Sequence, residues 1–138
     1  MTEEIGNEFH EGEDVSNLAV LKDRLIAKLG NKEYEVLWAV MIKPDDTLKG
    51  IEQIAKGNSN SVEAPQDKIF AAVKAAGVEK FALLHNHPSD SGDATPSRQD
   101  SFMTMITLIL GKREGLQLVD HLIVNKDNVG SIRQQRNL

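Results

Sequence analysis

The stretch "EKFALLHNH" (Glu79–His87) decides the fold of this 138-residue chain. Its apolar centre is typical of a strand buried inside a sheet, and at its polar end the chain leaves that sheet. Alternate side chains of a strand share a face, so His85 and His87 are expected to point one way and Asn86 the other. Two imidazoles on one face can occupy two adjacent corners of a tetrahedral zinc ion. The strand end therefore indicates either a metal site or a polar turn that happens to contain histidines.

Elements of two kinds alternate on either side of this strand. Apolar runs rich in strand formers and amphipathic runs that stop at glycine follow each other along the chain. Further strands are expected at 35–42, 47–55, 116–124 and 131–135, and helices at 16–29, 65–76 and from Ser97 onward. This alternation predicts an α/β fold with a mixed β-sheet flanked by helices.

The helix expected after the histidines returns toward them. Ser97 can cap this helix, and Asp100 then lies in its first turn. Asp100 can thus reach the strand end as a third, anionic ligand and leave a fourth position for water, the open arrangement of catalytic zinc sites. The same helix is expected to bury Phe102, Met103, Ile106, Ile109 and Leu110. Trp38 and Met105 are expected in the core as well.

Composition narrows the class of protein. The chain has no cysteine, which excludes disulfides, thiolate zinc ligands and the cysteine-containing plan of zinc deaminases, and which fits a cytoplasmic location. With a net charge of -5, direct binding to nucleic acid is not expected, and no apolar run is long enough for a membrane span. Residues 1–14 are expected to form a flexible acidic leader, and residues 15–138 a single domain.

The segments "HNHPS…TPSRQD" and "LVDHLIV" resemble the JAMM (MPN+/JAB) metallopeptidase superfamily, and within it the RadC-like branch. The likeness runs from about Glu33 to Arg133 and includes "APQDKIFAAVKAAG" and "GSIR". The resemblance implies a single JAB/MPN-type domain with a layout like that of cytidine deaminases. It also implies a zinc-dependent hydrolase that cleaves a peptide or isopeptide bond by metal-activated water.

The resemblance further implies roles for individual residues. The Zn²⁺ ligands that it implies are His85, His87 and Asp100. Ser97 would stabilise the oxyanion that forms when an amide carbonyl is attacked. The general acid/base of the family falls on Glu35, with Glu33 on the same strand face as the second choice.

Two further features bear on the site. Nine residues separate His87 from Ser97, two more than the usual spacing of the family, and Asp90–Ser91 is the expected insertion. Asp120 and His121 are neighbours on a strand and face opposite sides, so at most one of them is expected to point at the site. We expect this pair to support the structure around the metal rather than to act directly.

Three hypotheses follow for the function. The leading one is a JAMM-type zinc metallopeptidase whose substrate is a peptide or a ubiquitin-like protein. The second is a catalytically silent JAB-fold binding module, for which the longer loop is the main support. The third is a RadC-type role linked to DNA repair, against which the acidic charge argues. The sequence does not identify the substrate or the oligomeric state.

Overall fold

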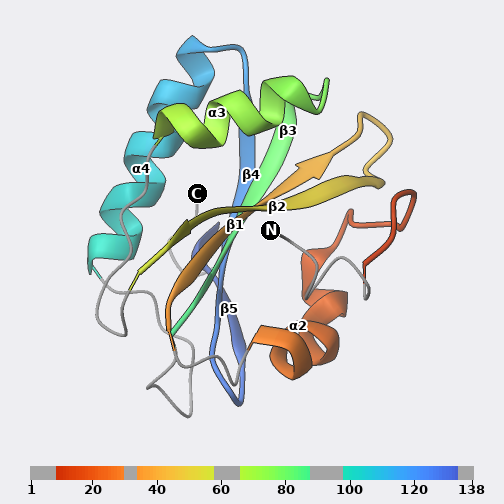
Figure 1. Cartoon of the computed structure of the whole chain (residues 1–138), viewed down its shortest axis with the longest axis vertical. Helices are drawn as coiled ribbons and strands as arrows, with labels where there is room; N and C mark the ends of the chain where they lie inside the picture. Colours follow the sequence, from red (N-terminus) through yellow and green to blue (C-terminus); the bar gives the residue numbers. More distant parts are fainter. Residues whose placement is uncertain (1–8, 30–33, 58–65, 88–97, 134–138) are drawn as a thin grey trace.

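A computed structural model of the chain describes residues 9–29, 34–57, 66–87 and 98–133 (Figure 1). In chain order its elements are η1 (Leu18–Leu21), α2 (Lys22–Leu29), β1 (Val36–Ile42), β2 (Leu48–Lys56), α3 (Gln66–Ala75), β3 (Lys80–Asn86), α4 (Arg98–Arg113), β4 (Gln117–Val124) and β5 (Val129–Ser131). This mixed sheet with flanking helices confirms the predicted α/β class. Within the described residues, no helix is long and apolar enough to cross a membrane.

The five strands form one sheet in the order β2-β1-β3-β4-β5, with β3 at its centre. β1 runs antiparallel to both β2 and β3, whereas β3 and β4 are parallel. Parallel neighbours need a crossover connection, and α4 lies within the one that joins β3 to β4. In this arrangement the end of β3 lies between β1 and β4, and the chain that leaves it must return along α4.

Two apolar cores cover the two faces of the sheet. Figure 1 shows α2 on one side of the sheet and α3 and α4 on the other. Side chains of β1 alternate between the cores: Trp38 packs with the residues of α2, and Leu37 packs with those of α3. All seven residues of β1 are buried, and the 2% exposure of Trp38 confirms its predicted place in the core. A strand covered on both faces explains the almost continuous apolar run from which it was predicted.

The most deeply buried residues of helix α4 are polar or small, so the predicted apolar face is only partly correct: Met103 and Leu110 pack against the core on the α3 side of the sheet. The buried residues of α4 are Asp100, Thr104, Thr107 and Gly111. Of the residues predicted to be buried, Phe102 is 69% exposed, Met105 42% and Ile109 46%. Met103, Ile106 and Leu110 are only half-buried.

Small side chains let α4 lie close to its neighbours. A Cβ atom added at Gly111 would lie 3.4 Å from the backbone oxygen of Leu116 and 3.6 Å from Cε1 of Phe70. At the other end of the same face, Thr104 and Asp100 replace bulky apolar groups and bring hydrogen-bonding atoms into the interior. Close approach and polar contacts therefore contribute to the choice of this face, beside the apolar contacts of Met103, Leu108 and Leu110.

The first described residues, which belong to the stretch expected as a flexible leader, pack against the sheet. Phe9 is 5% exposed and packs in the core on the α2 side of the sheet. The backbone N–H of Gly12 donates to the oxygen of Leu48 at 2.8 Å. Residues 1–8 of the expected leader lie outside the described part of the chain.

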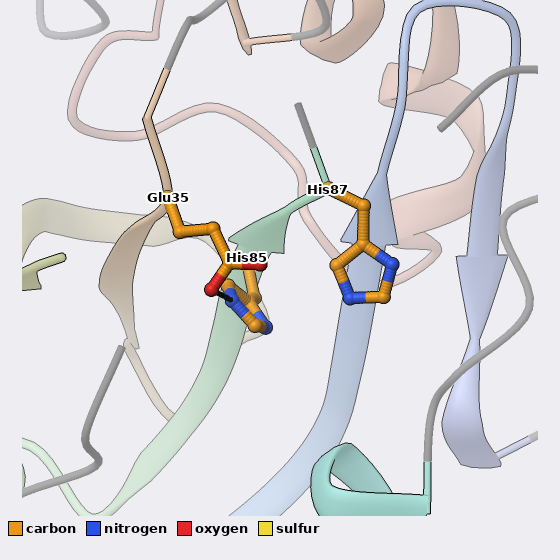
Figure 2. A group of neighbouring side chains, drawn as sticks. All are labelled: Glu35, His85 and His87. Carbon is orange, nitrogen blue, oxygen red and sulfur yellow. Dashed lines mark hydrogen bonds and ion pairs between the residues drawn. The ribbon is translucent and has the colours of Figure 1, made fainter. Parts of the chain in front are cut away.

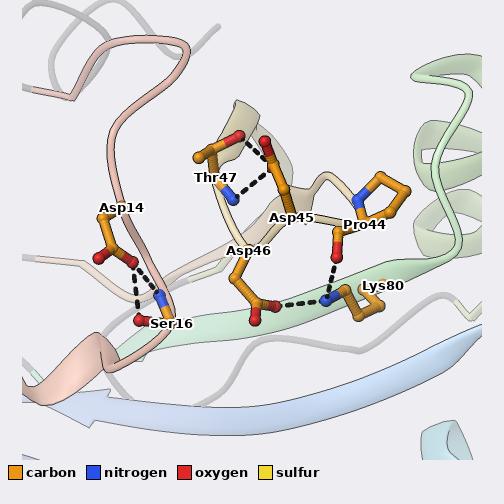
Figure 3. Close-up of polar contacts among 7 residues, drawn as sticks. All are labelled: Asp14, Ser16, Pro44, Asp45, Asp46, Thr47 and Lys80. Carbon is orange, nitrogen blue, oxygen red and sulfur yellow. Dashed lines mark hydrogen bonds and ion pairs between the residues drawn. The ribbon is translucent and has the colours of Figure 1, made fainter.

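Figure 3 shows polar contacts within this segment and others that join the β1–β2 turn to the start of the central strand. Oδ1 of Asp14 accepts hydrogen bonds from the backbone N–H of Ser16 at 2.9 Å and from its hydroxyl at 2.7 Å. In the β1–β2 turn, Asp46 adopts a positive φ of 66° and forms an ion pair with Lys80. Nζ of Lys80 also donates to the oxygen of Pro44 at 3.3 Å. Lys80 thereby anchors the first residue of β3 at the end opposite the histidines.

Candidate metal centre

The polar end of β3 carries two histidines on one face. His85 pairs in register with Leu37 of β1 and Ile123 of β4, and the backbone N–H of His87 donates to the oxygen of Val124 at 2.8 Å. Figure 2 shows both rings on the same side of the strand, and their centroids are 5.2 Å apart. The common face predicted from the H-x-H spacing is therefore present.

Asp100 joins the two histidines from α4. Its Oδ1 lies 3.2 Å from Nδ1 of His85, and its Oδ2 lies 2.9 Å from Nε2 of His87. The residue is 4% exposed although it lies in the first turn of a helix. The return of the chain after β3 thus brings the predicted third ligand into contact with the other two.

Glu35 approaches the same histidines from β1. It directly precedes β1, is 7% exposed, and has its Oε2 3.4 Å from Nε2 of His85. One ligand atom from each of Glu35, His85 and His87 lies within 4.8 Å of the other two, a spacing at which the three could hold one metal ion. The structure therefore places two carboxylates beside the histidines, Glu35 on one side and Asp100 on the other.

The residues present fit a divalent metal ion. Imidazole nitrogens and carboxylate oxygens are the ligand types of zinc sites without cysteine. His85 is buried, and burial alone would lower its pKa, but the carboxylates of Asp100 and Glu35 outweigh burial and raise the pKa to about 9. A cluster that retains a proton so strongly supplies the negative field that also attracts a cation.

Asn86 faces away from the cluster but determines where Glu35 lies. Its side chain is fully buried, and its Oδ1 accepts a hydrogen bond from the backbone N–H of Val36 at 2.7 Å. Its Nδ2 donates to the oxygen of Tyr34 at 2.9 Å. Both bonds fall on the residues that flank Glu35, so the start of β1 is fixed to the end of β3.

Asp120 and His121 point to different sides of β4, as predicted for strand neighbours. Asp120 accepts hydrogen bonds from the hydroxyl of Ser131 at 2.7 Å and from the backbone N–H of Arg133 at 3.2 Å, so it holds the segment around β5. His121 is fully buried, and its ring centroid is 6.1 Å from that of His85. His121 is therefore the member of the pair that lies beside the cluster.

Thr104 links His121 to the helix that carries Asp100. Its hydroxyl donates to the backbone oxygen of Asp100 at 2.7 Å, and its Oγ1 lies 2.7 Å from Nδ1 of His121. Thr104 belongs to none of the sequence motifs described above. Its position four residues after Asp100 was the available signal, because residues that far apart share a helix face.

Three of the sequence predictions fall outside the described residues. Ser97, the residue expected to stabilise an oxyanion, is one of them, and Glu33 is another. The insertion expected at Asp90–Ser91 is the third. The described part of the site therefore consists of the two histidines, the two carboxylates beside them, and the polar residues that hold these four in place.

Comparisons with known proteins point to one family. The family model of the RadC-like JAB domain matches residues 15–138. A UPF0758 protein of Clostridium beijerinckii is 30% identical over 115 residues, which cover 83% of this chain and 49% of that protein. A UPF0758 protein of Latilactobacillus sakei is 31% identical over 121 residues, which cover 88% of this chain and 53% of that protein. The chain thus spans about half the length of these curated relatives.

Proposed function

Because the chain belongs to the family of RadC-like JAB domains, we propose that it is a zinc-dependent hydrolase that cleaves an amide bond. The observation that supports this proposal is the buried cluster in which two histidines meet two carboxylates from different elements. His85 has a carboxylate beside each of its ring nitrogens, Glu35 at Nε2 and Asp100 at Nδ1. Imidazole nitrogens and carboxylate oxygens gathered in this way are the groups that a bound divalent cation would stabilise.

The roles that we propose follow from position. His85, His87 and Asp100 would hold the metal, because the carboxylate of Asp100 reaches both imidazoles. A zinc ion held there would act as a Lewis acid that makes a water molecule acidic near neutral pH. Glu35 would take the proton from that water and deliver it to the leaving amine, since its carboxylate lies at the edge of the cluster and is held by the start of β1.

The substrate class is part of the proposal. We infer an extended peptide or the tail of a ubiquitin-like protein as the substrate, and a cytoplasmic setting for the reaction. The support for the substrate is the family, together with the carboxylate of Glu35 3.4 Å from Nε2 of His85. The support for the setting is a sequence without cysteine. Ser97 would stabilise the oxyanion of the tetrahedral intermediate.

Zinc titration of chelator-treated protein tests the metal site directly. We expect one equivalent of Zn²⁺ to bind, with affinity lowered strongly in His85→Ala, His87→Ala and Asp100→Ala while circular dichroism still shows folded protein. Glu52→Ala, at an exposed position on β2, is the control and should bind zinc like the unmodified chain. Equal affinity in all five proteins would refute the site.

Hydrolysis is tested next, with the zinc-loaded chain and a library of quenched fluorescent peptides together with isopeptide-linked substrates. We expect cleavage of at least one class, abolished by chelation and by Asp100→Ala. Zinc binding without cleavage of any of them would instead favour the catalytically silent binding module.

A further inference from the structure

Thr104 makes two short side-chain contacts on the buried side of α4. Its hydroxyl donates to the backbone oxygen of Asp100, four residues earlier in the helix, at 2.7 Å. Its Oγ1 also lies 2.7 Å from Nδ1 of His121 on β4. All three residues are buried. The backbone of Asp100 is therefore connected through two side chains to a strand of the sheet.

The two contacts of Thr104 have fixed directions. A carbonyl oxygen only accepts, so the single proton of the Thr104 hydroxyl is the one donated to Asp100. The oxygen of the hydroxyl must then accept a hydrogen bond from Nδ1 of His121. His121 therefore carries a proton on Nδ1, and the hydrogen bonds run from its ring through the hydroxyl to the carbonyl of Asp100.

His121 has a fixed place in the sheet. It pairs in register with Leu83 of β3, two residues before His85, and its backbone N–H donates to Oδ1 of Asp120 at 2.7 Å. His85 in turn pairs with Ile123 of β4. The strand that carries His121 is thus aligned with the strand that carries the two histidines of the candidate metal centre.

We propose that Thr104 and His121 are positioning residues of the metal centre, which fix the place of Asp100 by holding the first turn of α4 against β4. The proposal rests on the metal site of the proposed function, in which Asp100 is a ligand. The two oxygens of Asp100 lie 3.2 Å from Nδ1 of His85 and 2.9 Å from Nε2 of His87. Because one carboxylate must keep both distances, the site tolerates little movement of the helix.

Apolar packing alone does not supply this precision. Met103 and Leu110 of α4 pack against the core on the α3 side of the sheet, but apolar contacts have no preferred direction. The hydrogen bonds of Thr104 have defined partners on both sides and fall at the turn that carries the ligand. A change at Thr104 is thus expected to alter metal affinity although its side chain is not a ligand.

Two threonines of α4 provide a matched comparison. Thr107 is also buried, but its hydroxyl accepts from Nε2 of Gln66 at 3.3 Å and makes no printed contact with β4. We expect Thr104→Val to bind zinc about 10–100-fold more weakly than the unmodified chain, and Thr104→Ser to recover most of that loss. Thr107→Val should bind zinc like the unmodified chain. Zinc affinity is measured by competition with a chromophoric chelator, with thermal unfolding of the metal-free proteins as the control for folding.

Two amides test the contribution of Nδ1 of His121. His121→Asn places an amide near the position of Nδ1 and keeps a donor to Thr104, whereas His121→Gln carries its amide farther out and loses that donor. We expect zinc affinity within a few-fold of the unmodified chain for His121→Asn and a loss of about 10–100-fold for His121→Gln. Thr104→Val combined with His121→Gln should lose no more than the larger single loss, because both changes break the same chain of hydrogen bonds.

Unchanged zinc affinity in Thr104→Val would overturn the positioning role while leaving the metal site intact. Equal losses in His121→Asn and His121→Gln, or losses that add in the double variant, would do the same. A lack of zinc binding by the unmodified chain would overturn the proposed function as well, so the two failures are distinguishable.

Histidine-ring ¹H–¹⁵N correlation spectra of the unmodified, metal-free chain give a readout that does not depend on any variant folding. We expect the His121 ring to be protonated on Nδ1, and this proton to exchange slowly with water because it is buried and bound to Thr104. A ring protonated only on Nε2 would make the Thr104 hydroxyl the donor to His121 and would contradict the proposal.

Discussion

The side-chain amide of Asn86 forms hydrogen bonds with both residues that flank Glu35. It accepts from the backbone N–H of Val36 at 2.7 Å and donates to the oxygen of Tyr34 at 2.9 Å, the residues on either side of that carboxylate. Asn86 is itself the residue between His85 and His87. One three-residue segment of β3 thus supplies two imidazoles on one face and, on the other, the group that positions the nearby carboxylate.

Removing the two hydrogen bonds of the Asn86 side chain should lower both the stability of the fold and the activity. Asn86→Ala leaves the backbone groups of Tyr34 and Val36 without their partner in the interior, and we expect the free energy of unfolding to fall by about 1–3 kcal/mol. Urea denaturation measures this loss. Glu52→Ala, on the exposed side of β2, is the control and should change the free energy by no more than about 0.5 kcal/mol. Similar losses of unfolding free energy in Asn86→Ala and Glu52→Ala would contradict this role of the Asn86 side chain.

Glu35→Gln tests whether this carboxylate moves protons or binds metal. The amide keeps the size of the side chain but cannot take a proton, so we expect zinc affinity within a few-fold of the unmodified chain and hydrolysis slower by a factor of about 10²–10⁴. Zinc competition and turnover are measured on the same preparation. A loss of zinc affinity as large as the loss of turnover would make Glu35 a ligand instead, a role that its spacing from the two histidines also permits.

Thr104→Val removes a hydroxyl without changing the shape of the side chain. Nδ1 of His121 loses its partner, so we expect a loss of about 1–3 kcal/mol in the free energy of unfolding. Thr107→Val is the matched control, because Thr107 is buried on the same face of α4 and accepts a longer hydrogen bond, 3.3 Å from Nε2 of Gln66. Urea denaturation of both variants should show the larger loss for Thr104, and Thr104→Ser should recover most of it.

His85 should make the folded state of the metal-free chain less stable at high pH. The pKa of His85 is about 9 in the folded state because the carboxylates of Asp100 and Glu35 outweigh its burial, whereas the reference value is 6.5. A raised pKa contributes stability that is fully present below pH 6.5 and is lost as the pH rises through about 9. Urea midpoints of chelator-treated protein should fall over that range, and His85→Gln should remove this part of the pH dependence.

His121 should make the folded state of the metal-free chain less stable at low pH. Its burial, together with the nearby His85 and His87, lowers its pKa to about 3. A lowered pKa contributes stability that is present above the reference value of 6.5 and is lost as the pH falls toward 3. The two histidines together predict greatest stability near pH 6.5 for the metal-free chain. A midpoint that rises continuously from pH 5 to pH 9 would show that other groups dominate.

The outward apolar side of α4 can be tested by comparing two phenylalanines. Phe102 is 69% exposed, so Phe102→Ala should change the free energy of unfolding by no more than about 0.5 kcal/mol. Phe81 on β3 is fully buried, and Phe81→Ala should cost about 3–5 kcal/mol. Urea denaturation measures the loss of unfolding free energy in both variants. Equal losses would indicate that Phe102 is buried, as expected from the sequence.

The two central strands β1 and β3 were predictable from the sequence because their physical cause is local, whereas the last strand, expected at 131–135, is β5 at Val129–Ser131. β1 and β3 are covered on both faces, which requires a continuous apolar run, and the runs at 35–42 and 79–87 contain both strands. The spacing of His85 and His87 likewise fixes a common face in any extended backbone.

The orientation of α4 was only partly predictable from hydropathy, because its most deeply buried residues are polar or small. The search for an apolar face selected residues such as Phe102, whereas the side that packs on the sheet begins at Asp100 and continues through Thr104 to Gly111. Counting helical turns from Asp100, the residue predicted to point inward, gives that face directly. For α4, the position of Asp100 predicts the buried face better than the exposed apolar residues do.

The remaining parts of the site depend on contacts between segments distant in sequence. Asn86 reaches Val36 across 50 positions, and Thr104 reaches His121 across 17. Neither pair leaves a periodic pattern, because each depends on the pairing of whole strands or on the packing of a helix. Only the tertiary structure shows these partners.

The strict alternation at the end of β3 also constrains how the sheet can pair. A slip of β3 by one residue against β1 would exchange the two faces of the strand. Asn86 would then face α4, and His85 and His87 would face the apolar core of α2 without acceptors for their ring nitrogens. A pairing shifted by one residue would therefore lose the contacts of both histidines and the hydrogen bonds of Asn86 together. The residues that form the candidate metal centre thus also help to select the correct alignment of the central strands.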